Sequence, residues 1–232
     1  MDKINSTLSI EQRELLDLHL RYVIEENKTT NLTRITDWET AKILHVEDSL
    51  VGVPFIEKAP QGDYLDMGTG AGFPGIPIAI TTERKTLLAD SVGKKITALN
   101  RMITKLSLEG IVSTFQGRIE DLAKGQPENF SVITARALSS LSSLLELASP
   151  LLKMNGHLIC YKSQDIDDEL MHAKTVCNKF GMKFIEVQNF TLSDRVTHRS
   201  IVVFEKTSKP SISQEELAWL RKSLSSKKTV SS

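Results

Sequence analysis

The feature that most constrains the fold is a glycine-rich segment, LDMGTGAGFPGIPIAI, which spans residues 65–80. It begins like an apolar strand, ends like an apolar helix, and carries four glycines in between: Gly68, Gly70, Gly72 and Gly75. Glycine is required where a turn adopts positive φ angles, or where a ligand approaches the backbone with no Cβ in the way. The segment therefore predicts a strand-to-helix turn whose free amides, at the start of the helix, favour an anionic group.

The chain after Asp63 alternates short apolar strands with helical stretches, which predicts a parallel sheet covered by helices on both faces. The strands are expected near residues 64–67, 86–90, 112–116, 131–135 and 157–161. The helices are expected near residues 74–81, 94–107, 141–151 and 167–180. Two further strands, near 183–188 and 200–205, are separated by too few residues for a crossover helix, so they should pair antiparallel.

Two helical segments precede this alternating pattern. Ser9 with Gln12, and Thr36 with Glu39, have the spacing of capping boxes that open helices. The polar stretch NKTTNLT at residues 27–33 lies between the two predicted helices and suits a loop.

The chain length of 232 residues suits one α/β domain with modest extensions. Ser213 with Glu216 predicts a capped terminal helix, followed by a tail rich in Ser and Lys. The expected organisation is an N-terminal helical extension over residues 1–60, an α/β domain over 61–207, and a C-terminal helix with a flexible tail over 208–232.

Composition excludes several classes of protein. The 29 basic and 29 acidic residues balance, so no global charge indicates a nucleic-acid or membrane-surface protein. Cys160 and Cys177 lack the spacing of a disulfide framework or a metal site, and no apolar run approaches the roughly 20 residues that span a bilayer. His45 and Asp48 have no third metal ligand nearby. We therefore expect a cytoplasmic protein with no metal and no membrane partner.

Basic residues are concentrated in two segments. Residues 84–105 contain six basic residues and one acidic residue, and residues 206–228 contain six basic and two acidic residues. Such segments either contact nucleic-acid phosphates, in which case binding weakens steeply with salt, or form ordinary solvated surfaces. The sequence leaves both interpretations open.

The glycine pattern by itself fits two cofactors. The pattern G-x-G-x-x-G from Gly70 matches dinucleotide-binding proteins, whereas D-x-G-x-G-x-G from Asp66 matches S-adenosylmethionine-dependent methyltransferases. Asp66 favours the second cofactor, because a carboxylate repels a pyrophosphate but pairs with the amino group of a methionine moiety. The antiparallel strand pair also favours it, since dinucleotide-binding sheets are ordinarily all parallel. Asp90 ends the next strand, where an acid holds the ribose hydroxyls of either cofactor.

Six motifs along the chain match one family. They are NKTTNLT (residues 27–33), HVEDSL (45–50), DMGTGAGFPGIPIAI (66–80), DSVGKK (90–95), GRIEDL (117–122) and ARAL (135–138). On these motifs the chain resembles the bacterial small-subunit ribosomal RNA guanine-N7 methyltransferases, also called glucose-inhibited division protein B. The resemblance implies a class I S-adenosylmethionine-dependent methyltransferase fold, which is Rossmann-like and has a seven-stranded sheet with an antiparallel last strand. It also implies methylation of guanine N7 in the 530 loop of 16S rRNA, on free rRNA or on the small ribosomal subunit, by a protein expected to be a monomer.

The expected cofactor site combines the loop pattern with positions that the resemblance implies. Its residues are Asp66, Gly68, Gly70, Gly72, Phe73, Asp90, Ser91, Ile119, Glu120 and Arg136. Arg136 and Lys162 are the candidate catalytic residues, and we expect Arg136 either to hold the cofactor or to contact guanine O6. The family usually shows Lys-Gly where this chain has Lys162 and Ser163, which leaves a substrate role for Lys162 open. His198 and Arg199, which open the last strand, receive no role.

The residues after the fourth strand, Thr134-Ala135-Arg136-Ala137, are consistent with N7 chemistry. Guanine N7 carries a free lone pair, so no catalytic base is needed. The segment has neither the Asn/Asp-Pro-Pro-aromatic motif of exocyclic amine methylation nor the cysteine of cytosine C5 methylation. Two alternatives stay open: a methyltransferase of the same fold acting on a small molecule or protein, and a non-catalytic RNA-binding assembly factor.

Overall fold

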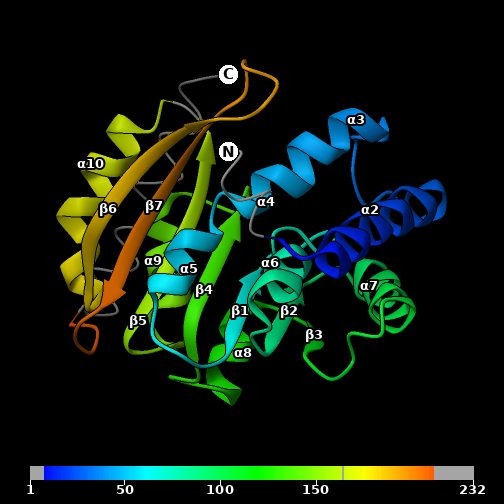
Figure 1. Ribbon diagram of the computed structural model, residues 1–232. Coiled ribbons are helices and arrows are strands. Elements are labelled where there is room, and N and C mark those ends of the chain that lie inside the picture. Colours follow the sequence, from blue (N-terminus) through cyan, green and yellow to red (C-terminus); the bar gives the residue numbers. More distant parts are fainter. Residues whose placement is uncertain (1–7, 164, 212–232) are drawn as a thin grey trace.

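The computed structural model describes residues 8–163 and 165–211, and seven strands of this part form one sheet in the order β3-β2-β1-β4-β5-β7-β6 (Figure 1). The strands are β1 (Tyr64–Met67), β2 (Thr86–Asp90), β3 (Val112–Gln116), β4 (Phe130–Arg136), β5 (Leu152–Ser163), β6 (Met182–Thr191) and β7 (His198–Lys206). β7 is antiparallel to both β5 and β6, and the other neighbouring strands are parallel. The predicted parallel sheet with a terminal antiparallel pair is therefore confirmed.

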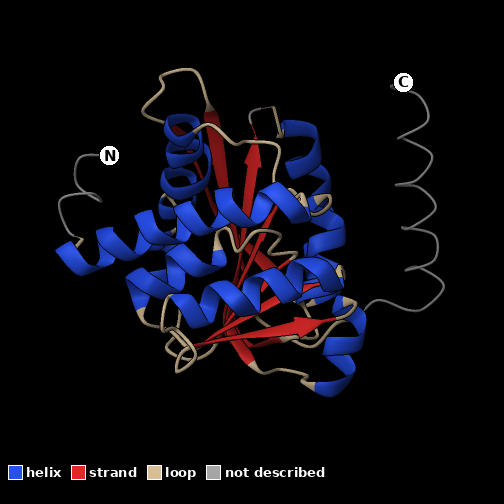
Figure 2. Ribbon diagram, turned by 90° about the vertical axis from the view of Figure 1, so that its right-hand side faces the viewer, coloured by secondary structure: helices blue, strands red, loops and turns tan. Residues whose placement is uncertain are grey.

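Helices cover both faces of the sheet, as the two ribbon views show (Figures 1 and 2). They are α2 (Ile10–Thr30), α3 (Trp38–Ala41), the π-helix η1 (Lys42–Glu47), α4 (Asp48–Leu50), α5 (Val53–Lys58), α6 (Gly75–Thr82), α7 (Gly93–Lys105), α8 (Ile119–Gly125), α9 (Leu141–Ala148), α10 (Asp167–Val176) and the 3-10 helix η2 (Cys177–Phe180). Side chains alternate across the strands, so Tyr64 of β1 packs into one core while Leu65 packs into the other.

The N-terminal helices share the first of these cores with the sheet. Leu16 and Leu20 of α2 belong to the same buried cluster as Ile78 of α6 and Leu88 of β2. The second core lies on the opposite face, where α8, α9 and α10 pack. The extension therefore completes one face of the sheet, which a central parallel strand requires because it is apolar on both sides.

Two predictions about the N-terminal helices need correction. The capping box of Ser9 and Gln12 is present, but the second helix is capped by Asp37, whose carboxylate accepts a 2.8 Å hydrogen bond from Thr40 N, and not by Thr36. The segment predicted as a loop is partly helical, because α2 continues to Thr30. It ends there because Asn31 adopts the left-handed conformation that Asn tolerates at a helix end.

The α/β region departs from prediction at two places. α8 has seven residues, which is too short to give a recognisable helical period, and it was not predicted. β5 begins at Leu152 and not at residue 157, because it continues through Asn155-Gly156, a dipeptide typical of turns. The predicted terminal helix, which the capping pair Ser213 and Glu216 would open, lies outside the described residues.

Candidate cofactor and acceptor sites

The glycine-rich loop connects β1 to α6 at the carboxyl ends of the central strands. Gly68, Gly70 and Gly72 have φ angles of +70°, +61° and +92°, which L side chains rarely adopt. The loop is tied to the next strand because Gly68 N donates a 2.9 Å hydrogen bond to the carbonyl oxygen of Ala89. A Cβ on Gly68 would lie 2.7 Å from the side chain of Leu138, in the segment that follows β4, so glycine keeps the space between these two segments open.

A pocket of about 420 Å³ lies beside this loop. Its wall contains Gly68, Ala89, Asp90, Ser91, Val92, Lys95, Gly117, Arg118, Ile119, Glu120, Ala137, Leu138, Ser139 and Leu147. Five of the ten predicted cofactor residues are in this wall: Gly68, Asp90, Ser91, Ile119 and Glu120. We refer to this pocket as the cofactor pocket. It occupies the crevice at the carboxyl ends of the strands, where open α/β sheets bind their ligands.

Asp90 fixes one side of the cofactor pocket. Its Oδ2 accepts a 3.1 Å hydrogen bond from Gly70 N, and its Oδ1 accepts a 2.9 Å hydrogen bond from Val92 N. Lys95 lies 3.5 Å from the same carboxylate. Gly70, which does not line the pocket, therefore contributes by holding Asp90 in place at the end of β2.

Asp66 lies behind the loop and outside the pocket wall. It is 1% exposed, and its two oxygens accept hydrogen bonds from Gly75 N (3.0 Å) and from Thr134 Oγ1 (2.7 Å). Burial raises the pKa of this carboxyl to about 6, although the hydrogen bonds from Thr134 and Gly75 oppose that shift. The carboxylate thus connects β1, β4 and the start of α6, and direct contact between Asp66 and a cofactor stays a prediction.

Phe73 is packed between two histidines of the N-terminal helices. Its ring stacks on His45 with centroids 4.7 Å apart, and lies 4.5 Å from the His19 ring. The Arg136 guanidinium lies 5.7 Å from the Phe73 centroid. Neither Phe73 nor Gly72 is in the wall of the cofactor pocket. The Phe73 side chain instead joins the loop to the helical extension.

A second pocket of about 420 Å³ adjoins the first, and we call it the acceptor pocket. Its wall contains Leu44, His45, Asp48, Arg136, Ala137, Tyr161, Lys162, Ser163 and Arg199. Ala137 lies in the walls of both pockets and has a φ of +52°, a strained conformation for a residue with a Cβ. The structure therefore brings the two candidate catalytic residues, Arg136 and Lys162, together in the acceptor pocket and not in the cofactor pocket.

Asp48 organises the acceptor pocket, and sequence reasoning missed this role. Its Oδ2 accepts a 2.9 Å hydrogen bond from Arg136 Nη1, and its Oδ1 accepts a 2.8 Å hydrogen bond from Arg199 Nε. Asp48 follows directly on the π-helix η1, a type of turn that is frequent at functional sites. Asp48 lies in the HVEDSL motif and Arg199 lies at the start of β7, but no local spacing in the sequence indicates that the two residues are in contact.

Lys162 is held within the wall of the acceptor pocket. Its Nζ donates to Glu169 Oε1 at 2.7 Å and to the carbonyl oxygen of Ser139 at 3.1 Å. Glu169 also accepts a hydrogen bond from Leu141 N at the start of α9. Lys162 therefore ties the end of β5 to α9 and α10.

The described wall of the acceptor pocket contains no cysteine, and His45 is its one imidazole. Burial, with a smaller contribution from the Arg136 charge, lowers the pKa of His45 to about 4, so this imidazole is neutral at pH 7. Its Nε2 lies 2.9 Å from Thr33 Oγ1. Cys160 of β5 is buried, and this burial raises the pKa of its thiol to about 12. A thiolate mechanism is inconsistent with that environment.

Part of the basic segment at residues 84–105 is engaged within the protein. Arg84 is buried and donates hydrogen bonds to four backbone carbonyls, those of Ile56, Ala59, Pro60 and Gly62. Arg101 pairs with Glu26 of α2. In the second segment, Lys206 is buried and donates to Ser149, and residues 212–228 lie outside the described part. The interpretation of residues 84–105 as a phosphate-binding surface is therefore wrong for Arg84.

Among the helices over 8–163 and 165–211, none is long and apolar enough to cross a membrane. Within the same ranges, no group of three or more His, Cys, Asp or Glu residues is arranged to hold a metal ion.

The fold agrees with solved structures of methyltransferases. The precorrin-6y C5,15-methyltransferase of Geobacter metallireducens GS-15 aligns with a TM-score of 0.53 and 12% identity, covering 69% of this chain and 88% of that one. The geranyl diphosphate C-methyltransferase of Streptomyces coelicolor A3(2) aligns with a TM-score of 0.54 and 10% identity, covering 68% and 79%. At these identities the comparison shows the fold alone, which is that of the class I methyltransferases.

Sequence comparison is more specific. The profile of the family described as rRNA small subunit methyltransferase G matches residues 12–201. Ribosomal RNA small subunit methyltransferase G of Desulfitobacterium hafniense (strain Y51) is 36% identical over 210 residues, covering 89% of this chain and 86% of the relative. The protein of the same name from Staphylococcus carnosus (strain TM300) is 34% identical over 207 residues, covering 88% and 86%. The chain belongs to the rRNA small subunit methyltransferase G family.

Proposed function

We propose that the protein transfers the methyl group of S-adenosylmethionine to N7 of a guanine in 16S rRNA. The observation that carries this proposal is the pair of adjoining pockets that share Ala137, one beside the glycine loop and one lined by arginines. Two pockets with a common wall suit a transfer reaction, because the donor and acceptor must be held with their reacting atoms adjacent. The family membership supports rRNA as the acceptor.

The residues of the cofactor pocket fit S-adenosylmethionine. Asp90 lies at the end of β2, where an acid receives ribose hydroxyls, and Ile119 provides an apolar wall beside Glu120 for the adenine. Gly68 keeps a space that a Cβ would fill. We assign Asp66 and Gly70 to positioning the loop and Asp90, since neither lines the pocket. When bound, the cofactor supplies an electrophilic methyl group on a sulfonium.

The acceptor pocket suits a guanine, because methylation at N7 removes no proton. N7 attacks through its free lone pair, so the residues of the described wall have to orient the base more than to act as acid or base. Arg136 lines this pocket, and we assign it to contact guanine O6, a common arginine acceptor. The product guanine is cationic, and the buried Asp48 carboxylate offsets the positive charge of the two arginines next to it. Lys162, already bound by Glu169, supports the wall and is not assigned to the reacting base.

The test uses labelled S-adenosylmethionine and small ribosomal subunits isolated from cells that lack the protein, followed by mapping of N7-methylguanosine. We expect one labelled guanine in 16S rRNA. Naked 16S rRNA is tested in parallel, and comparison of its methylation with that of the small subunit identifies the preferred substrate in the cytoplasm. Methyl transfer to proteins or small molecules alone would contradict the RNA assignment. The assembly-factor alternative would be favoured by an absence of cofactor binding at millimolar concentration, measured by calorimetry.

A further inference from the structure

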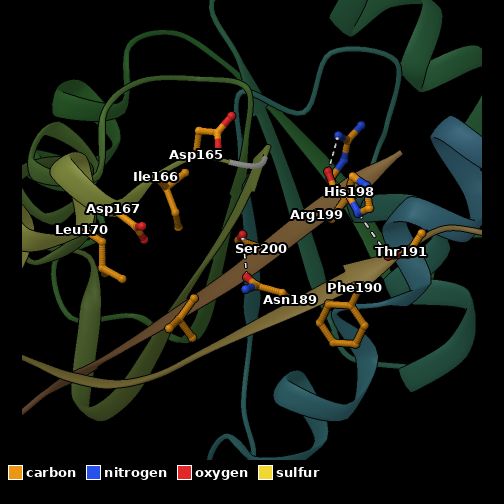
Figure 3. A pocket seen from close by; sticks show the side chains of 11 residues that line it. Asp165, Ile166, Asp167, Leu170, Asn189, Phe190, Thr191, His198, Arg199 and Ser200 are labelled. Atoms are coloured by element: carbon orange, nitrogen blue, oxygen red, sulfur yellow. Dashed lines mark hydrogen bonds between the residues drawn. The ribbon is translucent and has the colours of Figure 1, made fainter. Parts of the chain in front are cut away.

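A third pocket, of about 310 Å³, lies between the start of α10 and the outer strand pair β6–β7 (Figure 3). Its wall contains Asp165, Ile166, Asp167, Leu170, Val187, Asn189, Phe190, Thr191, His198, Arg199 and Ser200. Asp165, Ile166, Asp167 and Leu170 come from one side, and the side chains of Asn189, Thr191, His198 and Ser200 from the other. We call it the edge pocket, and the proposed reaction does not use it.

The strand side of the edge pocket presents polar groups in fixed positions. Ser200 Oγ donates a 2.8 Å hydrogen bond to Asn189 Oδ1, and Thr191 Oγ1 lies 3.1 Å from His198 Nδ1 (Figure 3). Both contacts join directly paired residues of β6 and β7. The Asn189 amide nitrogen has no hydrogen-bond partner among the described residues, so it is available to a ligand.

The helix side of the edge pocket is acidic at its rim and apolar below it. Asp165 and Asp167 are exposed, and within the described part of the chain no ion pair or hydrogen bond engages either carboxylate. Ile166 and Leu170, which line the same side of the pocket, are buried. Apolar walls suit the faces of a planar ring, and free carboxylates accept hydrogen bonds from amino groups.

The charge of the edge pocket selects the kind of ligand. Two carboxylates repel a phosphate, and the Arg199 guanidinium does not offset them, because it is bound to Asp48 and to the carbonyl oxygen of His198. A ligand that carries an amino group is favoured instead. Among nucleobases, cytosine, adenine and guanine carry an exocyclic amine, and carboxylates read cytosine N4 in this way.

The edge pocket adjoins the acceptor pocket. Arg199 lies in the walls of both, and its register partner Ser163 of β5 belongs to the acceptor pocket, two positions before Asp165. We propose that the edge pocket binds the amino-bearing base of a nucleotide next to the methylated guanine, and so contributes to the choice of target. This inference rests on the proposed function, since it requires RNA in the acceptor pocket.

Isosteric variants test the role of the two carboxylates. Asp165→Asn combined with Asp167→Asn removes both charges, and Asn tolerates the positive φ of residue 165 at least as well as Asp does. Asp168→Asn is the matched control, because Asp168 is in the same first helical turn but not in the pocket wall. With small subunits as substrate, we expect KM of the double variant to rise about tenfold, with kcat and cofactor affinity unchanged.

A crosslinking experiment identifies the ligand. Met171 is exposed one turn after Asp167, so a benzophenone side chain placed there reaches the pocket without filling it. We expect it to crosslink to 16S rRNA near the methylated guanine, whereas the same group at Met154, in the first part of β5, gives no such product.

Three outcomes separate the possibilities. If wild-type protein methylates the subunit and the double variant matches Asp168→Asn in KM, the edge pocket has no role in substrate binding and this inference is wrong. A crosslink from residue 171 to a ribosomal protein would show that the acidic rim binds a basic side chain, which also overturns it. If wild-type protein methylates no RNA at all, the proposed function itself fails.

Discussion

Arg136 donates a 2.9 Å hydrogen bond to Asp48, a carboxylate that is 1% exposed and 88 positions earlier in the sequence. The other oxygen of Asp48 accepts from Arg199, 151 positions later. One buried anion therefore sets the position of two guanidinium groups in the acceptor pocket. A buried carboxylate that accepts charge-assisted hydrogen bonds holds its partners in a fixed geometry. The two arginine side chains are therefore oriented before a substrate binds.

We expect Asp48→Asn to impair methyl transfer more than cofactor binding. The amide cannot accept from both arginines with the strength of a carboxylate, and two like charges then lie close together. The free energy of unfolding should decrease by about 1–3 kcal/mol, and kcat/KM with small subunits should fall at least about tenfold. Calorimetric titration with S-adenosylmethionine should give an affinity close to wild type. If cofactor affinity alone decreased, Asp48 would act on the cofactor pocket and this prediction would be wrong.

Arg136→Ala tests which pocket Arg136 serves. Because Arg136 lines the acceptor pocket, we expect methylation to fall at least about tenfold while cofactor affinity changes little. Cofactor titration and a methylation assay on small subunits give the two values separately. Unchanged cofactor affinity together with unchanged methylation would remove Arg136 from the site.

Gly68→Ala should weaken cofactor binding. The new Cβ would meet Leu138 at 2.7 Å inside the pocket, and alanine at a φ of +70° is strained by about 1–2 kcal/mol. Gly110→Ala is a suitable control, because no atom lies within 4 Å of a Cβ built there. Calorimetry should show a loss of cofactor affinity for the first variant alone. Equal affinities would mean that the cofactor does not lie against Gly68.

Arg84→Lys should destabilise the fold without altering the salt dependence of rRNA binding. Lysine cannot reach the four carbonyl oxygens that the guanidinium satisfies, so we expect the free energy of unfolding to fall by about 2–4 kcal/mol. Its exposed neighbour serves as the comparison, and Lys85→Gln should change stability by less than about 0.5 kcal/mol. Urea denaturation measures both. A reduced salt slope for the Arg84 variant would restore the phosphate-binding interpretation.

Stability should decrease as the pH falls from 6.5 toward 4. Burial lowers the pKa of His19 from 6.5 to about 3 and that of His45 to about 4, so the unfolded chain binds more protons across this window. Asp66 acts in the opposite direction: its pKa is raised from 3.8 to about 6, so its contribution is present below 3.8 and lost above 6. Two imidazoles outweigh one carboxyl, and the net change is a loss on acidification.

Urea denaturation at pH 7, 6 and 5 measures this dependence. His45→Gln keeps a hydrogen-bonding group near Thr33 but removes one titrating imidazole, so its free energy of unfolding should vary less between pH 6 and 5 than that of wild type. Identical pH slopes for the two proteins would show that His45 is not held neutral in the folded state.

Much of the architecture was predictable from local sequence. The bounds of β1, β2 and β3 match the predictions, because apolar runs between turn residues encode strands locally. The glycine loop, the antiparallel pair and the capping box at Ser9 were also predictable, because each is encoded by residues that are close together in the sequence. Asn155-Gly156 and α8 were not, since one resembles a turn and the other is too short to show a period.

The sequence by itself determined the class of fold, and it indicated that Gly68 and Asp90 lie at the same edge of the sheet, since both belong to short motifs at the ends of predicted strands. Only the tertiary structure decided that Asp48, Arg136 and Arg199 form one cluster, and that Arg84 is a buried structural residue. The physical reason is separation along the chain: contacts between residues 88 or 151 positions apart depend on how helices and strands pack, and no local spacing records that packing.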